Sequence, residues 1–341
     1  MSERSVYDRL VRPVLFSLEA ETAHHLALTG LRFASNVEPL LNALRRFQPQ
    51  RHPVTAFGLN FPNPFGLAAG FDKNGVALPA WEALGFGFVE IGTVTAKAQP
   101  GNPKPRIFRY PEQQALINRL GFNNDGADAV ASRLGRLRAS GRWPRIPVGI
   151  NIGKSKITPI DEAAEDYRYS FRQLREFADY IVLNVSSPNT PSLRDLQEQG
   201  ALTELLRAIG NENQTSAKPI LLKIAPDITL AQLDPIITTC ERYRIAAIIA
   251  TNTTLDHSTI QPDRDETGGL SGAPLRVRST EFIRAIKERT QLPVIGVGGV
   301  MDAESAREKF AAGATLLQVY TGYVYRGPRL LRELTALMPP D

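Results

Sequence analysis

The segment 183–190, LNVSSPNT, carries the clearest potential for chemistry in this chain. The apolar run YIVLNV predicts a buried strand, and polar side chains gather at its end: Asn184, Ser186, Ser187, Asn189 and Thr190. A buried polar group without a partner costs about 1–3 kcal/mol, so a small polar ligand is one way to satisfy these groups. A turn that satisfies its own backbone is the alternative. No histidine or carboxylate adjoins Ser187, so the segment does not indicate a hydrolase triad.

Eight apolar runs, including the one that ends in this segment, predict the strands that position it. They span 64–70, 87–93, 147–153, 180–186, 219–225, 246–252, 293–299 and 315–321. Amphipathic stretches between them predict helices over 76–84, 125–139, 161–177, 198–210, 229–242, 275–290, 302–312 and 328–337. Uniformly apolar strands that alternate with helices are typical of a buried parallel sheet.

Eight such units predict an α/β protein with a (β/α)8 TIM barrel. A doubly wound open sheet is the rival, and it would place a glycine-rich dinucleotide fingerprint after the first strand. The sequence AAGFDKNG at 68–75 lacks that spacing.

Polar residues converge on the strand ends, where barrels of this type place their active sites. They are Asp72, Lys73, Asn74, Thr93, Asn151, Lys154, Asn184, Lys223, Thr251, Asn252, Thr253 and Thr254. Three glycine segments, GGLSG (268–272), GVGG (296–299) and VYTG (319–322), predict a phosphate cradle at the same mouth. No His, Cys or carboxylate cluster with metal-ligand spacing occurs there, so we expect no metal.

Two of the strand-end lysines suggest a reaction. Lys73 and Lys223 could balance an anionic substrate or a negatively charged flavin, and a lysine beside a flavin stabilises its reduced anion. Ser187 would then accept a proton, which Thr190 or a water would carry away.

Composition limits the class of protein. The 341 residues are 43% hydrophobic and 22% charged, as in soluble globular proteins. A net charge of +5 without a basic block does not indicate nucleic-acid binding. No apolar run reaches the roughly 18 residues of a membrane span. The N-terminus does not resemble a signal peptide. The single cysteine, Cys240, lies in a predicted helix as a structural thiol, and an intracellular compartment is the default expectation.

Residues 1–48 predict a separate N-terminal extension, and residues 49–341 the barrel domain. Apolar residues at helical spacing predict two short amphipathic helices, broken near 17–21. They form either a cap over the bottom of the barrel or an interfacial pair that dips into a membrane. Charges in this segment are nearly balanced, so membrane attachment would be mostly hydrophobic.

Ten motifs in order along the chain resemble one family, the dihydroorotate dehydrogenases of pyrimidine synthesis, in their quinone-dependent, membrane-associated class 2. The motifs are AAGFDKNG (68–75), EIGTVTAKAQPGNPKPRIFR (90–109), INRLGFNNDG (117–126), GINIGKSK (149–156), LNVSSPNTPSLRDLQ (183–197), LLKIAPD (221–227), IATNTT (249–254), GGLSGAPL (268–275), IGVGGV (295–300) and LLQVYTGYVYRGP (316–328). Class 1 relatives usually have cysteine at the position of Ser187, so serine there is typical of class 2.

The resemblance implies one FMN per chain and the oxidation of (S)-dihydroorotate to orotate, on the route to UMP. A hydride would pass from C6 to flavin N5, while Ser187 takes the C5 proton and Thr190 relays it. The substrate would be held by Lys73, Asn118, Arg119, Leu120, Gly121, Phe122, Asn184, Asn189, Asn252 and Thr253. FMN would contact Ala69, Gly70, Phe71, Asp72, Lys73, Thr93, Asn151, Asn184, Lys223 and Thr251, with its phosphate at Gly272, Gly299, Tyr320 and Thr321.

The extension would form an apolar tunnel that delivers quinone, with His24 and Arg109 at its polar end. Which of His24 and His25 faces the quinone stays open. The resemblance further implies a monomer, peripherally attached to the cytoplasmic side of the inner membrane. Removal of residues 1–48 is expected to abolish turnover with quinone and to spare flavin reduction. A soluble flavin barrel that uses fumarate or NAD, and a non-catalytic membrane scaffold, are the alternatives.

Overall fold

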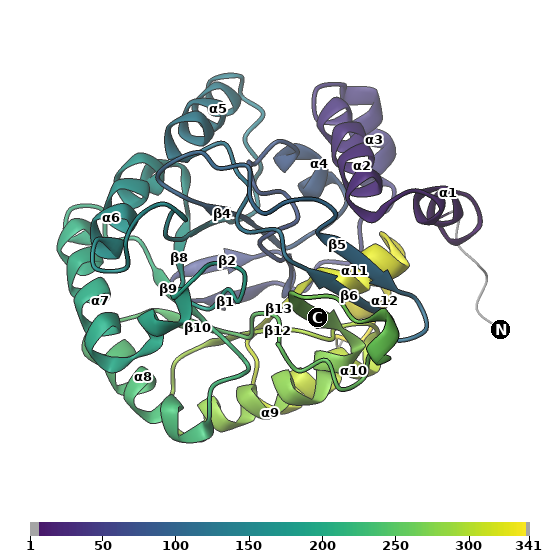
Figure 1. The fold of residues 1–341 in the computed structure, drawn as a ribbon. Coiled ribbons are helices and arrows are strands. Elements are labelled where there is room, and N and C mark those ends of the chain that lie inside the picture. The colour runs from purple at the N-terminus through teal and green to yellow at the C-terminus, as the bar shows by residue number, and fades with distance from the viewer. Residues whose placement is uncertain (1–6, 339–341) are drawn as a thin grey trace.

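A closed parallel barrel forms the centre of the molecule (Figure 1). A computed structural model describes residues 7–338; Val6 of the predicted first helix and residues 339–341 lie outside this range. The barrel strands follow one another in chain order: β3 (Phe65–Leu67), β4 (Phe88–Val94), β7 (Val148–Ile152), β8 (Tyr180–Asn184), β9 (Ile220–Ile224), β10 (Ala247–Ala250), β12 (Val294–Val297) and β13 (Leu316–Val319). β13 pairs with β3 and closes the ring. The predicted fold class is confirmed.

Helices surround the barrel, and all but one lie at the predicted places (Figure 1). They are α4 (Leu78–Ala83), α5 (Ala127–Ala139), α6 (Ala163–Leu174), α7 (Gln199–Asn213), α8 (Leu230–Arg242), α9 (Arg276–Lys287), α10 (Ala303–Ala311), α11 (Thr321–Arg326) and α12 (Arg329–Thr335). Asp302 caps α10 by accepting a hydrogen bond from the Ser305 N–H at 2.9 Å. Helix α11 was not predicted; the chain leaves the sheet after Val319, earlier than the apolar run suggested.

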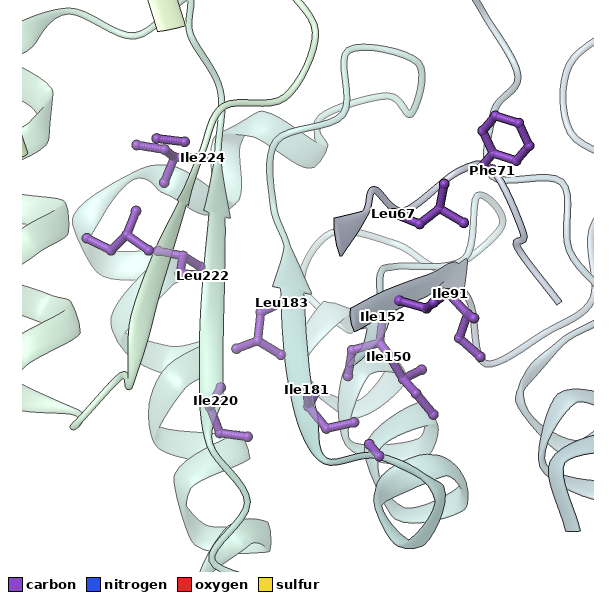
Figure 2. Close-up of a cluster of buried hydrophobic side chains, with 14 of the residues drawn as sticks. Leu67, Phe71, Ile91, Ile150, Ile152, Ile181, Leu183, Ile220, Leu222 and Ile224 are labelled. Carbon is purple, nitrogen blue, oxygen red and sulfur yellow. The ribbon is translucent and has the colours of Figure 1, made fainter. Parts of the chain in front are cut away.

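Two sets of apolar side chains fill the spaces inside and outside the strands. Outward-facing residues such as Leu67, Ile91, Ile150, Leu183 and Leu222 form the core against the helices (Figure 2). Inward-facing residues fill the lower half of the barrel; they include Phe88, Tyr180, Val182, Leu221 and Ile249. Because successive side chains of a strand point to opposite faces, strands buried on both faces are apolar throughout.

A hairpin, rather than the N-terminal helices, covers the bottom of the barrel. Its strands β1 (Val54–Ala56) and β2 (Leu59–Phe61) were not predicted. The Phe61 ring lies 5.3 Å from the Phe88 ring, and Phe57 lies 5.8 Å from Tyr180. The interpretation of the extension as a bottom cap is therefore wrong.

The extension itself lies at one side of the barrel, beside α4 and β5 (Figure 1). It contains a single π-helical segment (Tyr7–Val11), α1 (Arg12–Ser17), α2 (Ala20–Ala34) and α3 (Glu38–Arg45). The predicted break falls between α1 and α2. The count of two helices is wrong, because Pro39 in its first turn begins a third helix.

A small antiparallel sheet was also missed. It consists of β5 (Ile107–Tyr110), β6 (Ala115–Asn118) and β11 (Gly269–Gly272). The glycine segment GGLSG therefore pairs as a strand instead of forming a free loop. A Cβ on Gly269 would lie 2.0 Å from the Thr253 hydroxyl oxygen, so only glycine fits this approach.

Candidate active site

The carboxyl ends of the strands and the small sheet enclose one cavity of about 1060 Å³, counted out to its open mouth. Most predicted site residues line it: Ala69, Gly70, Lys73, Thr93, Asn118, Leu120, Gly121, Phe122, Asn184, Ser187, Asn189, Lys223, Thr251, Asn252, Thr253, Gly272, Gly299, Tyr320 and Thr321. Seven predicted residues do not: Phe71, Asp72, Arg119, Asn151, Thr190, and the quinone-site residues His24 and Arg109.

Ser187 lies in the turn after β8 with its side chain at the cavity wall. Its Oγ accepts a hydrogen bond from the Asn189 N–H at 3.2 Å. The Asn189 amide group donates to the Asn118 carbonyl at 3.0 Å and so ties the turn to β6. Thr190 is buried beyond the lining, and within the described residues no hydrogen bond joins its hydroxyl to Ser187.

A chain of hydrogen bonds runs beneath the cavity from one strand end to the next. Asn184 Nδ2 donates to Thr93 Oγ1 at 2.9 Å, and Thr93 Oγ1 donates to Asn151 Oδ1 at 2.5 Å. Asn151 Nδ2 donates to Glu90 Oε1 at 2.9 Å, and Gln318 Nε2 donates to Glu90 Oε2 at 2.5 Å. Glu90 is fully buried inside the barrel. A carboxylate only accepts hydrogen bonds, so Glu90 fixes which way the two amides point.

Sequence reasoning missed Glu90 and Gln318, although each is a lone polar residue in an apolar strand. Gln318 lines the cavity, and its buried Oε1 has no hydrogen-bond partner. The buried Tyr180 hydroxyl likewise lacks another partner, and burial raises the pKa of Tyr180 while a side-chain interaction with Gln318 opposes that rise, so the two groups lie within reach of each other inside the barrel.

Two lysines at the cavity wall, the buried Lys223 and the partly exposed Lys73, give the cavity positive charge. Burial lowers the pKa of Lys223, and the charge of Glu90 opposes that shift. Burial, followed by the nearby Arg106, lowers the pKa of Lys73 to about 7. Lys73 Nζ donates to Asn123 Oδ1 at 2.7 Å. Both ammonium groups are therefore desolvated cations that an anionic ligand would stabilise.

Glycines shape the far wall of the cavity. Gly272 and Gly299 have φ of +100° and +71°. A Cβ on Gly299 would lie 2.5 Å from the Arg276 Cα, so the backbone conformation and the available space both exclude a side chain. Ser271 and Thr321 join their hydroxyl groups at 2.9 Å beside them. Bare backbone and hydroxyl groups at this wall suit a phosphate.

The predicted residues outside the lining stabilise the loops that form it. The Asp72 carboxylate accepts hydrogen bonds from the N–H groups of Val76 and Ala77 and from the Trp81 indole, at 2.8, 2.9 and 3.1 Å. The Phe71 ring packs against Trp81. Arg119 binds Glu266 at 2.7 Å. These side chains act on the site through the backbone they hold.

A second pocket lies between the extension and the small sheet. It is lined by Phe16, Ala20, Ile107, Phe108, Arg109, Tyr110, Pro111, Arg264 and Glu266. Ile107 lines both this pocket and the main cavity, so it forms part of the wall between them. Arg109 donates to the Leu15 carbonyl at 3.0 Å and lies over the Phe16 ring.

The two neighbouring histidines of α2 differ in environment. The His24 ring lies 5.1 Å from the Phe71 ring, and burial together with Lys73 lowers the pKa of His24 to about 3. The His25 side chain is 54% exposed and binds Glu21. His24 is therefore the inward-facing member, although the structure does not place it in the pocket with Arg109.

Other expectations concern residues away from the cavity. Cys240 is buried in α8, as expected of a structural thiol. Within residues 7–338, no group of three His, Cys, Asp or Glu is arranged to hold a metal ion. In the same range, no helix has the length and apolar character to cross a bilayer.

Comparison with known proteins identifies the family of this chain. The family model described as dihydroorotate dehydrogenase matches residues 52–339. The chain belongs to the dihydroorotate dehydrogenase family. A protein of Gloeobacter violaceus named dihydroorotate dehydrogenase (quinone) is 54% identical to the chain, covering 96% of this chain and 92% of the relative. Its namesake from Salinispora arenicola is 50% identical, covering 97% and 98%.

Solved structures of this family share the fold. The crystal structure of DHODH from Eimeria tenella in complex with ferulenol superposes with a TM-score of 0.84 at 37% identity. It covers 93% of this chain and 89% of that chain. Coverage of this extent exceeds the barrel domain alone, so the shared region includes part of the extension.

Proposed function

We propose that this protein oxidises (S)-dihydroorotate to orotate in pyrimidine biosynthesis and passes the electrons to a quinone. The observation that carries the proposal is the convergence of Ser187, Lys73 and a set of asparagines on one buried cavity. Relatives of about 50% identity along nearly the whole chain, all named dihydroorotate dehydrogenase (quinone), support the same activity.

The cavity fits FMN, one per chain. Gly272 and Gly299 leave bare backbone for its phosphate, and Lys223 supplies a buried cation. A bound flavin would supply the hydride acceptor of the reaction. Thr93, Asn184 and Thr251 would hold the ring from the neighbouring strand ends.

Dihydroorotate would lie between the flavin and the loop 118–122. Lys73 would pair with its carboxylate, which would keep the lysine protonated despite a pKa of about 7. Amides of Asn118, Asn189 and Asn252 would bind the polar edges of its ring.

Ser187 would take the C5 proton. Its own hydroxyl proton would have to leave as the C5 proton arrives, and the Asn189 N–H, which donates to Oγ, would stabilise the alkoxide character that this loss creates. Thr190 lies three residues away and is buried, so a bridging water would be needed to relay the proton to it.

Quinone would reach the flavin through the pocket beside Arg109, whose wall includes Ile107. Exposed apolar side chains on the extension, among them Leu10, Val14, Leu26 and Phe33, would contact the membrane. We further propose, as the resemblance implies, a monomer that is peripherally attached to the cytoplasmic face of the inner membrane.

The test of the proposal is anaerobic reduction of the purified, flavin-loaded protein. Dihydroorotate should bleach the flavin absorbance, and a soluble quinone should restore it, whereas fumarate and NAD should not. Ser187→Ala should slow bleaching by about 10²- to 10⁴-fold while orotate still binds. Near-normal bleaching by this variant would refute Ser187 as the base.

A further inference from the structure

One carboxylate of the N-terminal extension is buried against the barrel domain. Glu21 of α2 is 2% exposed. Its oxygens accept hydrogen bonds from Arg106 Nε at 3.1 and 3.2 Å, and from Arg106 Nη2 at 2.8 Å. These contacts, with Lys104 at 3.5 Å, lower the pKa of Glu21 to about 2 despite burial. The pair is thus a buried two-point contact between the extension and the segment just before β5.

The rest of the Arg106 guanidinium organises its own segment. Nη1 donates to the Pro100 carbonyl at 2.6 Å and to the Asn102 carbonyl at 2.9 Å. The fork of the arginine therefore holds Glu21 and the turn 100–102 at the same time. A lysine could not satisfy both sides of this arrangement.

The segment 99–106 in turn holds the backbone of the predicted substrate loop 118–122. Arg119 N–H donates to the Arg106 carbonyl at 2.9 Å, and Asn102 N–H donates to the Leu120 carbonyl at 3.1 Å. Asn102 Nδ2 donates to the Arg119 carbonyl at 3.0 Å, and Gln99 Nε2 donates to the Gly121 carbonyl at 3.0 Å. Three consecutive loop residues are therefore fixed on a segment that Arg106 organises.

We propose that the Glu21–Arg106 pair is a positioning element, through which the N-terminal extension holds the substrate loop 118–122 over the cavity. The proposal rests on the proposed function for the assignment of orotate to this cavity. It gives the extension a part in the dihydroorotate half of the reaction as well as in quinone delivery. Loss of residues 1–48 should then impair flavin reduction, contrary to the expectation from the resemblance.

The experiment is an orotate titration of the full-length, flavin-loaded protein, followed by the change in flavin absorbance. Glu21→Gln removes the charge without changing shape, and Arg106→Lys keeps the charge without the fork. Each should weaken orotate binding roughly tenfold, within the range of couplings between sites. The double variant should be no weaker than either single variant, because all three break the same link.

Arg142→Gln is the matched control. Arg142 holds the C-terminal end of the same helix, by donating to the Ser35 carbonyl at 3.2 Å and to Asn36 Oδ1 at 2.7 Å. Its loss should loosen α2 without touching the segment 99–106, and orotate affinity should stay unchanged. An equal loss in this control, or wild-type affinity in Glu21→Gln, would overturn the proposal.

Two further outcomes distinguish a failure of the proposed function from a failure of the positioning role. If the wild-type protein does not bind orotate, the proposed function fails and the role of the pair fails with it. If the variants do not fold, hydrogen exchange of the wild-type protein decides. Orotate should then protect the amides of 99–106 and of α2 around Glu21 together with 118–122. Protection confined to the loop would contradict the proposal.

Discussion

Replacement of Glu90 should show how much the chain of hydrogen bonds beneath the cavity stabilises the fold. Its carboxylate accepts hydrogen bonds from the Asn151 and Gln318 amides inside the barrel, where no solvent replaces them. Glu90→Leu leaves two buried N–H donors without an acceptor. At about 1–3 kcal/mol for each unpaired group, unfolding should become easier by about 2–6 kcal/mol. Glu90→Gln keeps one acceptor and should lose about half as much.

Removal of a buried charge can also stabilise a protein, but only where its polar partners are replaced together with it. Asn151 and Gln318 remain in both variants, so we expect a net loss. The assay is urea denaturation followed by fluorescence, with the midpoint and slope compared. Ser170→Ala is the control, because the Ser170 hydroxyl is buried without a partner and its removal should cost little. A decrease of less than about 1 kcal/mol in the free energy of unfolding of Glu90→Leu, or equal decreases in Glu90→Leu and Glu90→Gln, would refute the reasoning.

Three other predictions concern single titratable groups. The contacts of Glu21 lower its pKa from 4.5 to about 2, so its contribution to stability is complete well above pH 4.5 and is lost as the pH falls towards 2. Acid denaturation of Glu21→Gln should lack this component. Burial lowers the pKa of Lys309 to about 7, so the unfolded chain binds more protons between pH 7 and 10.5, and stability should rise with pH there. In Lys309→Met this rise, measured by urea denaturation, should become smaller, because Lys73 and Lys223 still contribute to it. Burial raises the pKa of Cys240 to about 12, so thiol reagents at pH 8 should label it only after denaturant is added, and labelling of the native protein would contradict its burial.

The barrel could be predicted from sequence because its strands are buried on both faces. Runs such as Ile220–Ile224 are almost wholly apolar, and their polar ends mark the side of the active site. The pairs in the small sheet could not be found in the same way. Gly269 pairs with Asn118 across about half the chain, and its glycine-rich strand has no apolar alternation.

The two unexpected polar contacts were hidden for a related reason. Glu90 and Gln318 stand 228 positions apart, and Glu21 and Arg106 stand 85 apart. Each residue alone looks like an ordinary polar position. Only the closure of the barrel and the docking of α2 bring the partners together. A local sequence pattern cannot reveal contacts between residues so far apart in the chain.

In the lower barrel interior, two aromatic rings occupy the space that a side chain on a neighbouring glycine would need. A Cβ on Gly66 would lie 2.3 Å from the Phe88 ring, and a Cβ on Gly149 would lie 2.1 Å from the Tyr180 ring. Neither member of such a pair can be replaced independently in the course of evolution. A larger residue at the glycine position requires a smaller one in place of the ring, and a smaller residue in place of the ring alone leaves a void. Divergent descendants of this chain should therefore change these positions in concert, so that the barrel floor evolves by exchanging volume between neighbouring strands.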